Sequence, residues 1–261
     1  FQGRQVPMDL SGKIIAITGA GRGLGAAMAL RLASRGCALA LIDLDEDALD
    51  RTAGECRDAG AADVETWLIN VAKETDVEQA FAQIADRFGA LHGLVNNAGI
   101  TRDAFTLKYR DGELVGKMSL NEWQLVIDVN LTGSFLCGRE AAAQMIALGC
   151  QGCIINISSI SRHGNMGQAN YSASKAGVES LAVVWAKEFA RHGIRAASIA
   201  PGFIGTEMVM AMKPEAREKL SSGIPLQRIG DPGEIASTVE FILENDYVSG
   251  RCFEIDGALR L

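Results

Sequence analysis

Short apolar segments rich in β-branched residues alternate with helix-like segments along this chain. Seven such segments occur, at residues 13–18, 37–43, 64–69, 91–95, 153–157, 194–200 and 252–256. Between the third and the fourth, apolar residues from Val77 to Phe88 recur at the spacing of an amphipathic helix. Parallel strands need crossover connections of this kind, so the alternation predicts an α/β fold with a doubly wound parallel sheet. Ligands of such sheets bind at the carboxyl ends of the strands.

Composition limits the partners and the compartment. The 261 residues, 48% of them hydrophobic, suit one large domain, which we expect over residues 8–261, because residues 1–7 look like the remnant of a cleaved tag. A net charge of −7 argues against nucleic acid and anionic membranes as partners, and no apolar run approaches the ~20 residues of a membrane span. The six cysteines lie in apolar contexts without a metal-binding pattern, so we expect no metal site and the reduced thiols of a cytoplasmic protein.

A glycine-rich loop joins the first strand to the following helix. The loop residues expected to line a bound cofactor are Gly19, Gly21, Arg22, Gly23, Leu24 and Gly25. Absent side chains let the backbone approach a pyrophosphate, and the amino terminus of the helix supplies N–H groups. The spacing G-x-x-x-G-x-G departs from the dinucleotide fingerprint G-x-G-x-x-G, and a glycine turn without a ligand is the alternative. The strand–loop–helix context favours the phosphate site.

Two charged residues bear on the choice between NAD and NADP. Asp43 ends the second strand, where a carboxylate accepts hydrogen bonds from the adenosine ribose and repels a 2′-phosphate. Arg22 favours NADP, because its charge could meet that phosphate. We weigh Asp43 more heavily and expect NAD, with NADP as the alternative. Further cofactor contacts are expected where strands end, at Leu44, Asn70, Val71, Asn97, Ala98 and Gly99.

Hydroxyl groups and a tyrosine–lysine pair follow the fifth strand. Ser158 and Ser159 lie at the strand end, and Tyr171 and Lys175 open a helix with a spacing that places them on one face, one turn apart. An ammonium group beside a phenol favours the phenolate, so Lys175 is expected to lower the pKa of Tyr171, as proton exchange with an alcohol or a ketone requires. The alternative is a core tyrosine with a lysine whose charged end reaches solvent.

Three other segments carry structural expectations. Residues 100–118 form a polar, locally basic connection. Residues 119–148 predict one long helix with Asn130 near its middle, where the amide either bends the helix or perturbs it to hold a water beside the active site. Residues 205–223 mix methionine with charge, which suits a mobile lid or adaptable surface packing. Helices are also expected near residues 46–59, 170–192 and 232–243.

The chain resembles the short-chain dehydrogenase/reductase family over nearly all of its length after Met8. The matching motifs, in order, are Thr18-Gly19-x-x-x-Gly23-x-Gly25, Asn96-Asn97-Ala98-Gly99, Asn130, the paired serines, Tyr171-x-x-x-Lys175, and Pro201-Gly202 with Thr206. Within the family, residues 95–103, 167–171, 200–204 and 225–230 look most like 3-oxoacyl-[acyl-carrier-protein] reductases. The resemblance implies a Rossmann-type sheet of about seven strands with helices on both faces, NAD(P)-dependent oxidoreductase activity and a homotetramer.

The same resemblance implies a site of four parts. Tyr171 would exchange a proton with the substrate oxygen, Lys175 would assist it and bind the nicotinamide ribose, and Asn130 would hold a relay water. A serine would polarise the carbonyl, and the cofactor would carry the hydride. Cofactor contacts implied after the sixth strand are Pro201, Gly202, Ile204 and Thr206.

Several features depart from the family pattern. Counting thirteen residues back from the tyrosine selects Ser158 as the catalytic serine, whereas the strand pattern selects Ser159 with one residue missing from the loop. We favour Ser159, because a loop absorbs a deletion more easily than a buried strand does. Asp43 contradicts the NADP use typical of the acyl-carrier-protein reductases, and Asn70 stands where the family often has Asp. The 100–118 connection is also longer than usual.

The leading hypothesis is therefore an NAD(H)-dependent reductase of 3-oxoacyl thioesters linked to acyl carrier protein or coenzyme A, or the reverse 3-hydroxyacyl dehydrogenase. The second is an NAD-dependent dehydrogenase of another secondary alcohol, such as a sugar, a polyol or a cyclic alcohol. The third is a nucleotide-binding sensor with little turnover, which the complete set of Asn130, a serine, Tyr171 and Lys175 disfavours.

Overall fold

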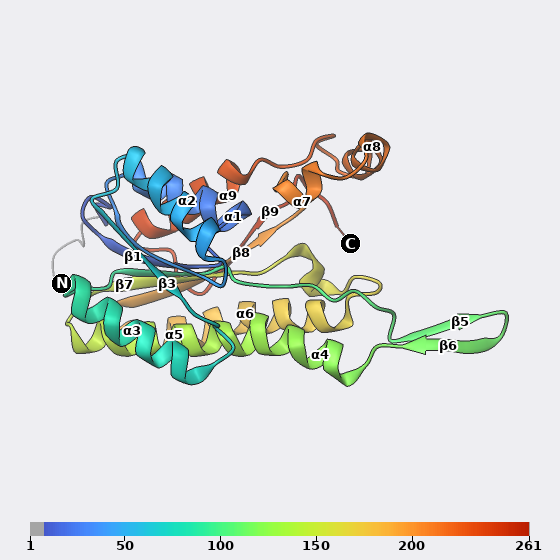
Figure 1. Cartoon of the computed structure of the whole chain (residues 1–261), viewed down its shortest axis with the longest axis horizontal. Coiled ribbons are helices and arrows are strands. Elements are labelled where there is room, and N and C mark those ends of the chain that lie inside the picture. The colour runs from blue at the N-terminus through green and yellow to red at the C-terminus, as the bar shows by residue number, and fades with distance from the viewer. Residues whose placement is uncertain (1–7, 261) are drawn as a thin grey trace.

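A seven-stranded parallel sheet forms the centre of the molecule in this computed structural model, which describes residues 8–260 (Figure 1). Its strands are β1 (Ile14–Thr18), β2 (Ala38–Asp43), β3 (Asp63–Leu68), β4 (Gly93–Asn96), β7 (Gly152–Ile157), β8 (Ile194–Pro201) and β9 (Cys252–Ile255). They lie in the order β3-β2-β1-β4-β7-β8-β9. The doubly wound α/β sheet predicted from the sequence is confirmed, while the expected tag remnant at residues 1–7 lies outside the described residues.

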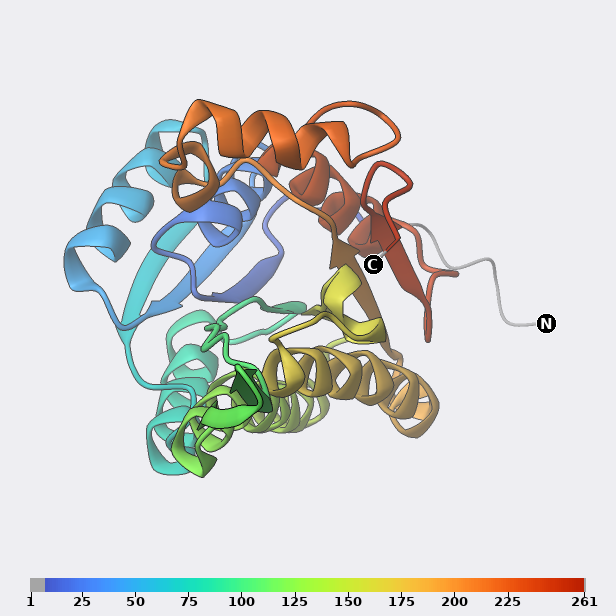
Figure 2. The ribbon, with the colours of Figure 1, turned by 90° about the vertical axis from the view of Figure 1, so that its right-hand side faces the viewer.

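Helices cover both faces of the sheet (Figures 1 and 2). The helices α1 (Gly23–Ala33), α2 (Glu46–Asp58) and α9 (Pro232–Glu244) pack on one face, and α3 (Glu74–Phe88), α5 (Gly133–Ala147) and α6 (Ala169–Glu188) pack on the other. Within β1, Ile15 and Ile17 belong to the first of these two cores, whereas Ile14 and Ala16 belong to the second. Because neither face meets water, the strand is a continuous apolar run without polar alternation.

The strand order reverses at β1, and this reversal positions the candidate site. β1 pairs with β2 on one side and with β4 on the other, both in parallel. The connections that leave the carboxyl ends of β1 and β4 therefore lead to opposite faces of the sheet and part from each other. The glycine loop after β1, the Asn-rich turn after β4 and the serines after β7 all lie along this edge.

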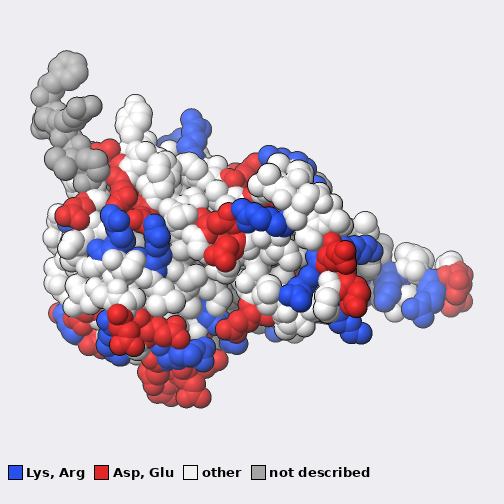
Figure 3. Space-filling model, turned by 90° about the horizontal axis from the view of Figure 1, so that it is seen from above, with Lys and Arg blue, Asp and Glu red and all other residues white. Residues whose placement is uncertain are grey.

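The polar connection expected at residues 100–118 contains an antiparallel hairpin that the sequence analysis missed. Strand β5 (Leu107–Arg110) pairs with β6 (Glu113–Lys117) through a two-residue turn at Asp111 and Gly112, whose φ angles are 52° and 84°. Asp-Gly favours this kind of turn, because both residues tolerate positive φ and the backbone twist matches that of paired strands. The hairpin projects from the body, and basic and acidic side chains lie close together on it (Figures 1 and 3).

A π-helical segment divides the single long helix predicted over residues 119–148. Helix α4 (Leu120–Val126) begins after Ser119, which forms a reciprocal capping box with Glu122. The segment Ile127–Thr132 is π-helical, and α5 follows it directly. Asn130 lies inside the π-helical segment, so the helix is perturbed at the residue that the sequence singled out. Such segments are rare and recur at functional sites.

Short elements complete the chain. Three-residue-per-turn helices occur at Ile160–His163 and Ala190–His192, so the helix predicted over residues 170–192 is α-helical only as far as Glu188. The expected lid region contains α7 (Glu207–Met210) and α8 (Pro214–Ser222), and its mobility stays a prediction. Among residues 8–260, no helix is long and apolar enough to cross a membrane.

Candidate active site

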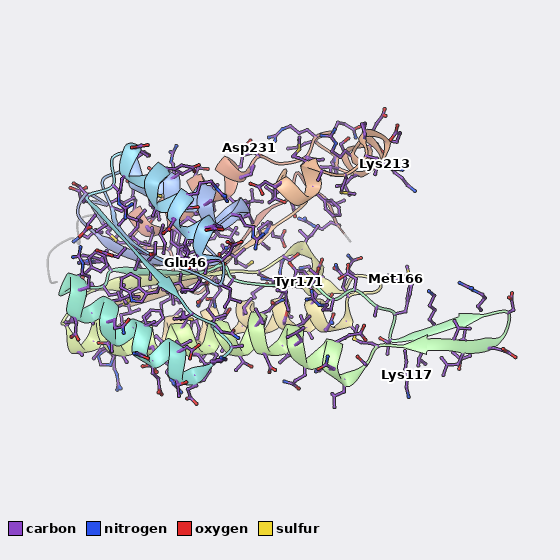
Figure 4. The ribbon with its side chains drawn as sticks, viewed as in Figure 1. Glu46, Lys117, Met166, Tyr171, Lys213 and Asp231 are labelled. Atoms are coloured by element: carbon purple, nitrogen blue, oxygen red, sulfur yellow. The ribbon has the colours of Figure 1, made fainter. Side chains whose placement is uncertain are left out.

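Tyr171 and Lys175 lie together near the start of α6. The Lys175 Nζ atom is 5.5 Å from the centroid of the Tyr171 ring. It also donates a hydrogen bond of 2.7 Å to the carbonyl oxygen of Ile157, the last residue of β7. In Figure 4, Tyr171 lies at the end of α6 that is nearer to Met166 and to the hairpin. The pair therefore stands at the carboxyl end of a central strand, where ligands of this fold bind.

Burial governs the protonation of both groups. Burial lowers the pKa of Lys175 to about 8. Burial raises the pKa of Tyr171; a hydrogen bond with Ser159 opposes the rise, and the Asp103 carboxylate adds to it. The sequence predicted that Lys175 lowers the pKa of Tyr171; the net shift in the chain without a cofactor is a rise, and the contribution of Lys175 stays a prediction. The loss of solvent around the phenol dominates, and the ammonium group of Lys175 is engaged by a backbone carbonyl.

The side chains of the two adjacent serines have different hydrogen-bond partners. The Ser158 Oγ atom is buried and donates to the carbonyl oxygen of Lys175 at 2.8 Å, so this serine ties β7 to α6. The Ser159 side chain is the hydrogen-bond partner of the Tyr171 phenol, and its Oγ atom also accepts from the Ser161 N–H at 3.1 Å. The structure thus brings Ser159 to Tyr171 and uses Ser158 in packing.

Asn130 connects the π-helical segment to the turn after β4. Its side chain is buried, donates to the carbonyl oxygen of Ile100 at 2.9 Å and to Ser174 Oγ at 3.2 Å, and accepts from the Ile100 N–H at 2.8 Å. A Cβ atom placed on Gly99 would lie 3.3 Å from Asn130 Oδ1 and 3.5 Å from Lys175 Nζ. Both amide protons of Asn130 are therefore used, and only an acceptor lone pair of Oδ1 remains for a water molecule.

The glycine loop leaves the amino terminus of α1 accessible. Gly19 and Gly23 have φ angles of +64° and +56°, which glycine adopts without a steric penalty. A Cβ atom on Gly25 would lie 1.9 Å from the carbonyl oxygen of Gly19, so only glycine fits there. No side chain caps α1, and its first turn holds no acidic residue. Its first N–H groups and its positive dipole end are therefore free for an anion, and the loop fits a pyrophosphate.

Asp43 ends β2 with its carboxylate directed at this loop. Its Oδ2 atom accepts from the Gly21 N–H at 2.9 Å, and its Oδ1 atom accepts from the Leu44 N–H at 2.7 Å. Arg22 lies 3.5 Å from Asp45 in an exposed ion pair. The Asp45 N–H also donates to Oδ1 at 3.3 Å, so Oδ2 keeps a lone pair for a ribose hydroxyl, and the carboxylate would repel a 2′-phosphate. Arg22, in contrast, already has an acidic neighbour.

Thr18 joins the glycine loop to the turn after β4. Its Oγ1 atom accepts from the N–H groups of Asn97 and Ala98, at 3.0 Å in both cases. The Asn97 amide donates to the carbonyl oxygens of Thr18 and Gly19 at 3.1 and 3.0 Å. These bonds fix the phosphate side of the site against the side that carries Tyr171.

The remaining predicted contacts lie along the same edge. Pro201 ends β8, and a Cβ atom on Gly202 would lie 2.7 Å from the Cα atom of Asp256. Thr206 is beside the glycine loop, 3.7 Å from a Cβ atom placed on Gly23. Asn70 accepts from the Ala72 N–H at 3.0 Å, Val71 and Ile204 are buried, and Leu24 packs against the core. Their contacts with a cofactor stay predictions.

Sequence reasoning missed three polar residues around Tyr171. Asp103 accepts hydrogen bonds of 3.1 and 3.2 Å from Gln168 and acts on the Tyr171 pKa. Asn170 is fully buried and donates to two backbone carbonyl oxygens. Arg162 is buried directly after the serine turn. Closeness in sequence to Tyr171 and to the serines was the only signal for Asn170 and Arg162, and Asp103 lacked even that, because it comes from a distant segment.

The chain is similar to known proteins over nearly all of its length. The family model described as short chain dehydrogenase matches residues 13–217. A (3R)-3-hydroxyacyl-CoA dehydrogenase of Canis lupus familiaris is 38% identical over 263 residues, which cover 97% of this chain and 98% of that protein. A 3-oxoacyl-[acyl-carrier-protein] reductase of Thermotoga maritima is 38% identical over 255 residues, covering 97% and 99%. A crystal structure of a provisionally named gluconate dehydrogenase from Agrobacterium tumefaciens superposes with a TM-score of 0.86 at 35% identity and covers 98% of each chain.

Proposed function

The chain belongs to the short-chain dehydrogenase/reductase family and is an NAD(P)-dependent oxidoreductase, and on that premise we propose that it interconverts 3-oxoacyl and 3-hydroxyacyl thioesters with NAD(H). The observation that carries the proposal is the grouping of Ser159, Tyr171 and Lys175 at the strand ends beside the glycine loop. The thioester class is supported by the names of the two curated relatives. The carrier is coenzyme A or acyl carrier protein.

Three side chains divide the proton chemistry. When a carbonyl is reduced, the Tyr171 hydroxyl donates its proton to the carbonyl oxygen as that oxygen gains charge. Ser159, the hydrogen-bond partner of that hydroxyl, donates a second bond to the same oxygen and polarises the carbonyl. Lys175 holds positive charge near the phenol and stabilises the phenolate that remains. When an alcohol is oxidised, the phenolate takes its proton. The bound nicotinamide supplies or accepts the hydride.

Asn130 completes the proposed proton path. Its Oδ1 atom keeps one lone pair and lies on the same side of Gly99 as the Lys175 ammonium group. A water molecule held between the two can return a proton from solvent toward Tyr171. The side chain also fixes Ile100, so the same amide holds the turn after β4 in place.

The direct test of the function is a pair of initial-rate measurements, NADH and NADPH oxidation with acetoacetyl-CoA as the ketone. We expect fast turnover with NADH. Turnover with NADPH alone would keep the substrate class and overturn the role given to Asp43. No turnover with either cofactor, together with measurable NADH binding, would reject the thioester substrate.

A dehydrogenase of another secondary alcohol is the second candidate. The solved Agrobacterium protein is named for a polyhydroxy acid. In this chain, Asp103 and Gln168 form an exposed hydrogen-bonded pair beside Tyr171, which suits a substrate with several hydroxyl groups. NAD⁺ reduction with a panel of polyols and sugar acids distinguishes the two, and cofactor binding without turnover on any alcohol would indicate a sensor.

We expect Asp43→Asn to weaken the preference for NADH over NADPH. The amide keeps an oxygen that can accept from the Gly21 N–H, but it removes the charge that repels a 2′-phosphate. The ratio of kcat/KM values for NADH and NADPH should fall by roughly 10- to 100-fold. Asp47→Ala, a nearby carboxylate in the first turn of α2, is the control and should leave the ratio within about threefold. If Asp43→Asn left the ratio of kcat/KM values unchanged, the Asp43 carboxylate would not determine the choice between NADH and NADPH.

We also propose that the chain assembles as a homotetramer. Phe135, Ile146 and Val184 are apolar residues exposed on α5 and α6, and burying them against further copies would remove this surface from water. Light scattering at micromolar protein should give the mass of four chains, and the mass of one chain would contradict the proposal.

A further inference from the structure

Arg162 is a buried arginine beside the proposed active site. It lies in the short helix Ile160–His163, which follows Ser159 directly, and its side chain is only 4% exposed. Burying a guanidinium group is costly unless each of its donors finds a partner. The partners of Arg162 therefore indicate what this helix is attached to.

Two carboxylates hold the Arg162 side chain. Its Nε atom pairs with Glu179 of α6, and its Nη2 atom pairs with Glu254 of β9. Glu254 in turn accepts from Arg260 at 2.9 Å, near the carboxyl end of the chain. Glu179 lies one helical turn beyond Lys175 and two turns beyond Tyr171. Arg162 thus joins its own short helix to the helix that carries both residues.

One further guanidinium nitrogen and the backbone N–H of Arg162 bind the carbonyl oxygen of Ser159. Its Nη1 atom donates to the Ser159 carbonyl oxygen at 3.2 Å, and its backbone N–H donates to the same oxygen at 3.1 Å. The Ser159 side chain meanwhile contacts the Tyr171 phenol. One residue therefore holds Ser159 from the backbone side while the hydroxyl of Ser159 faces the reacting position.

We propose that Arg162 is a positioning residue that fixes the Ser159 turn against α6, and so sets the distance between the Ser159 hydroxyl and Tyr171. It does not touch the reacting atoms and acts only through Ser159; the inference rests on the proposed function of that serine. A hydrogen-bond donor that polarises a carbonyl must be held to within about 0.5 Å of its productive position. Two ion pairs with carboxylates on separate elements, together with two hydrogen bonds to the Ser159 carbonyl oxygen, provide such a restraint.

The test is a double-mutant cycle between Arg162→Met and Ser159→Ala. Ser159→Ala should lower kcat by roughly 100- to 1000-fold, and Arg162→Met should lower it by roughly 10- to 100-fold with the KM for NADH within about twofold. In the Ser159→Ala background, Arg162→Met should change kcat by less than about threefold, because the group that it positions is gone. If the double variant lost kcat by the product of the two single-variant factors, the two residues would act independently and the proposal would be overturned.

Arg31→Met is the matched control for loss of a partly buried ion pair. Arg31 pairs with the buried Glu240 between α1 and α9, away from Tyr171. Arg31→Met should lower the melting temperature, because an ion pair is lost, but leave kcat within about twofold of wild type. Arg162→Lys keeps the positive charge but loses the planar guanidinium group that reaches several partners at once. Its kcat should therefore lie between those of wild type and Arg162→Met. If Arg162→Met does not fold, Arg162→Lys and Glu179→Gln carry the same cycle.

A second readout needs no turnover. The Tyr171 phenol can be titrated by ¹³C NMR of labelled tyrosine, with its signal identified by its loss in Tyr171→Phe. Asp103 and Lys175 are the charged groups that face it, and neither changes in these variants. Because the Ser159 hydrogen bond lowers the pKa of Tyr171, Ser159→Ala and Arg162→Met should both raise it, and the double variant should match Ser159→Ala. An unshifted titration in Arg162→Met would overturn the inference. If the Tyr171 pKa shifted as expected but the enzyme turned over no thioester, the proposed substrate class would be rejected, whereas the positioning role of Arg162 would be retained.

Discussion

Tyr171→Phe should reduce turnover by about 1000-fold while leaving NADH binding within about threefold of wild type. The substitution removes only the hydroxyl group, which is the proposed proton donor. The ring, its packing and its position 5.5 Å from Lys175 Nζ are retained. The carbonyl oxygen then receives a hydrogen bond from Ser159 but no proton, so the step that neutralises it is lost. Stopped-flow rates measure the first quantity, and NADH fluorescence titration measures the second.

Tyr247→Phe is the control for this experiment, because it removes the same hydroxyl from a side chain that is 97% exposed. Its turnover should lie within about twofold of wild type. If Tyr171→Phe kept activity within tenfold of wild type, another group would have to donate the proton. Ser159→Ala in the same assay would then show whether the serine supplies it.

The sheet was predictable because its central strands are buried on both faces. Continuous apolar runs such as Ile14–Thr18 need no knowledge of the fold to be recognised as strands. The hairpin at residues 107–117 was missed for the opposite reason. Its strands are exposed and rich in charge, so no apolar pattern marks them, and the Asp111-Gly112 turn was the only local signal. The π-helical segment was predicted only as a perturbation at Asn130, because an interior Asn competes for backbone hydrogen bonds without specifying the type of helix that results.

The candidate site was predictable wherever its residues lie close in sequence. The spacing of Tyr171 and Lys175 is a property of one helix, and the glycine loop is a property of one strand–helix junction. The choice between Ser158 and Ser159 is different, because successive residues at a strand end face opposite sides and either spacing rule is plausible. The two side chains differ in the folded chain, since Ser158 bonds to the backbone of α6 and Ser159 to the phenol.

Properties that depend on the packed interior were beyond the sequence. The pKa of Tyr171 was predicted to fall because a cation lies one turn away, and it rises because the phenol loses its water. The role of Arg162 gave no signal beyond its closeness to the serines, because its partner Glu254 lies 92 residues away in β9. Long-range burial decides both results, and local spacing carries no information about it.

Gly25→Ala should abolish cofactor binding at concentrations that saturate wild type. A Cβ atom at this position would lie 1.9 Å from the Gly19 carbonyl oxygen, 2.8 Å from the Gly19 carbonyl carbon and 2.9 Å from the Ala20 Cα atom. All three are backbone atoms of the glycine loop, so no side chain can rotate away, and α1 and the loop must separate. We expect the Kd for NADH to rise at least about 100-fold, because the N–H groups at the start of α1 lose their position.

Gly54→Ala is the control, because it adds a methyl group to a helical glycine without the steric clash expected at Gly25. Gly54 lies in α2 with no atom within 4 Å of a Cβ placed on it. Alanine there should stabilise the helix by about 0.5–1 kcal/mol and leave NADH binding unchanged. In Gly25→Ala, overpacking should cost about 1–3 kcal/mol, which for a chain of this size lowers the melting temperature by roughly 2–12 °C. If Gly25→Ala bound NADH within threefold of wild type, the pyrophosphate would not lie on this loop, and the proposal that the start of α1 holds the cofactor would have to be abandoned.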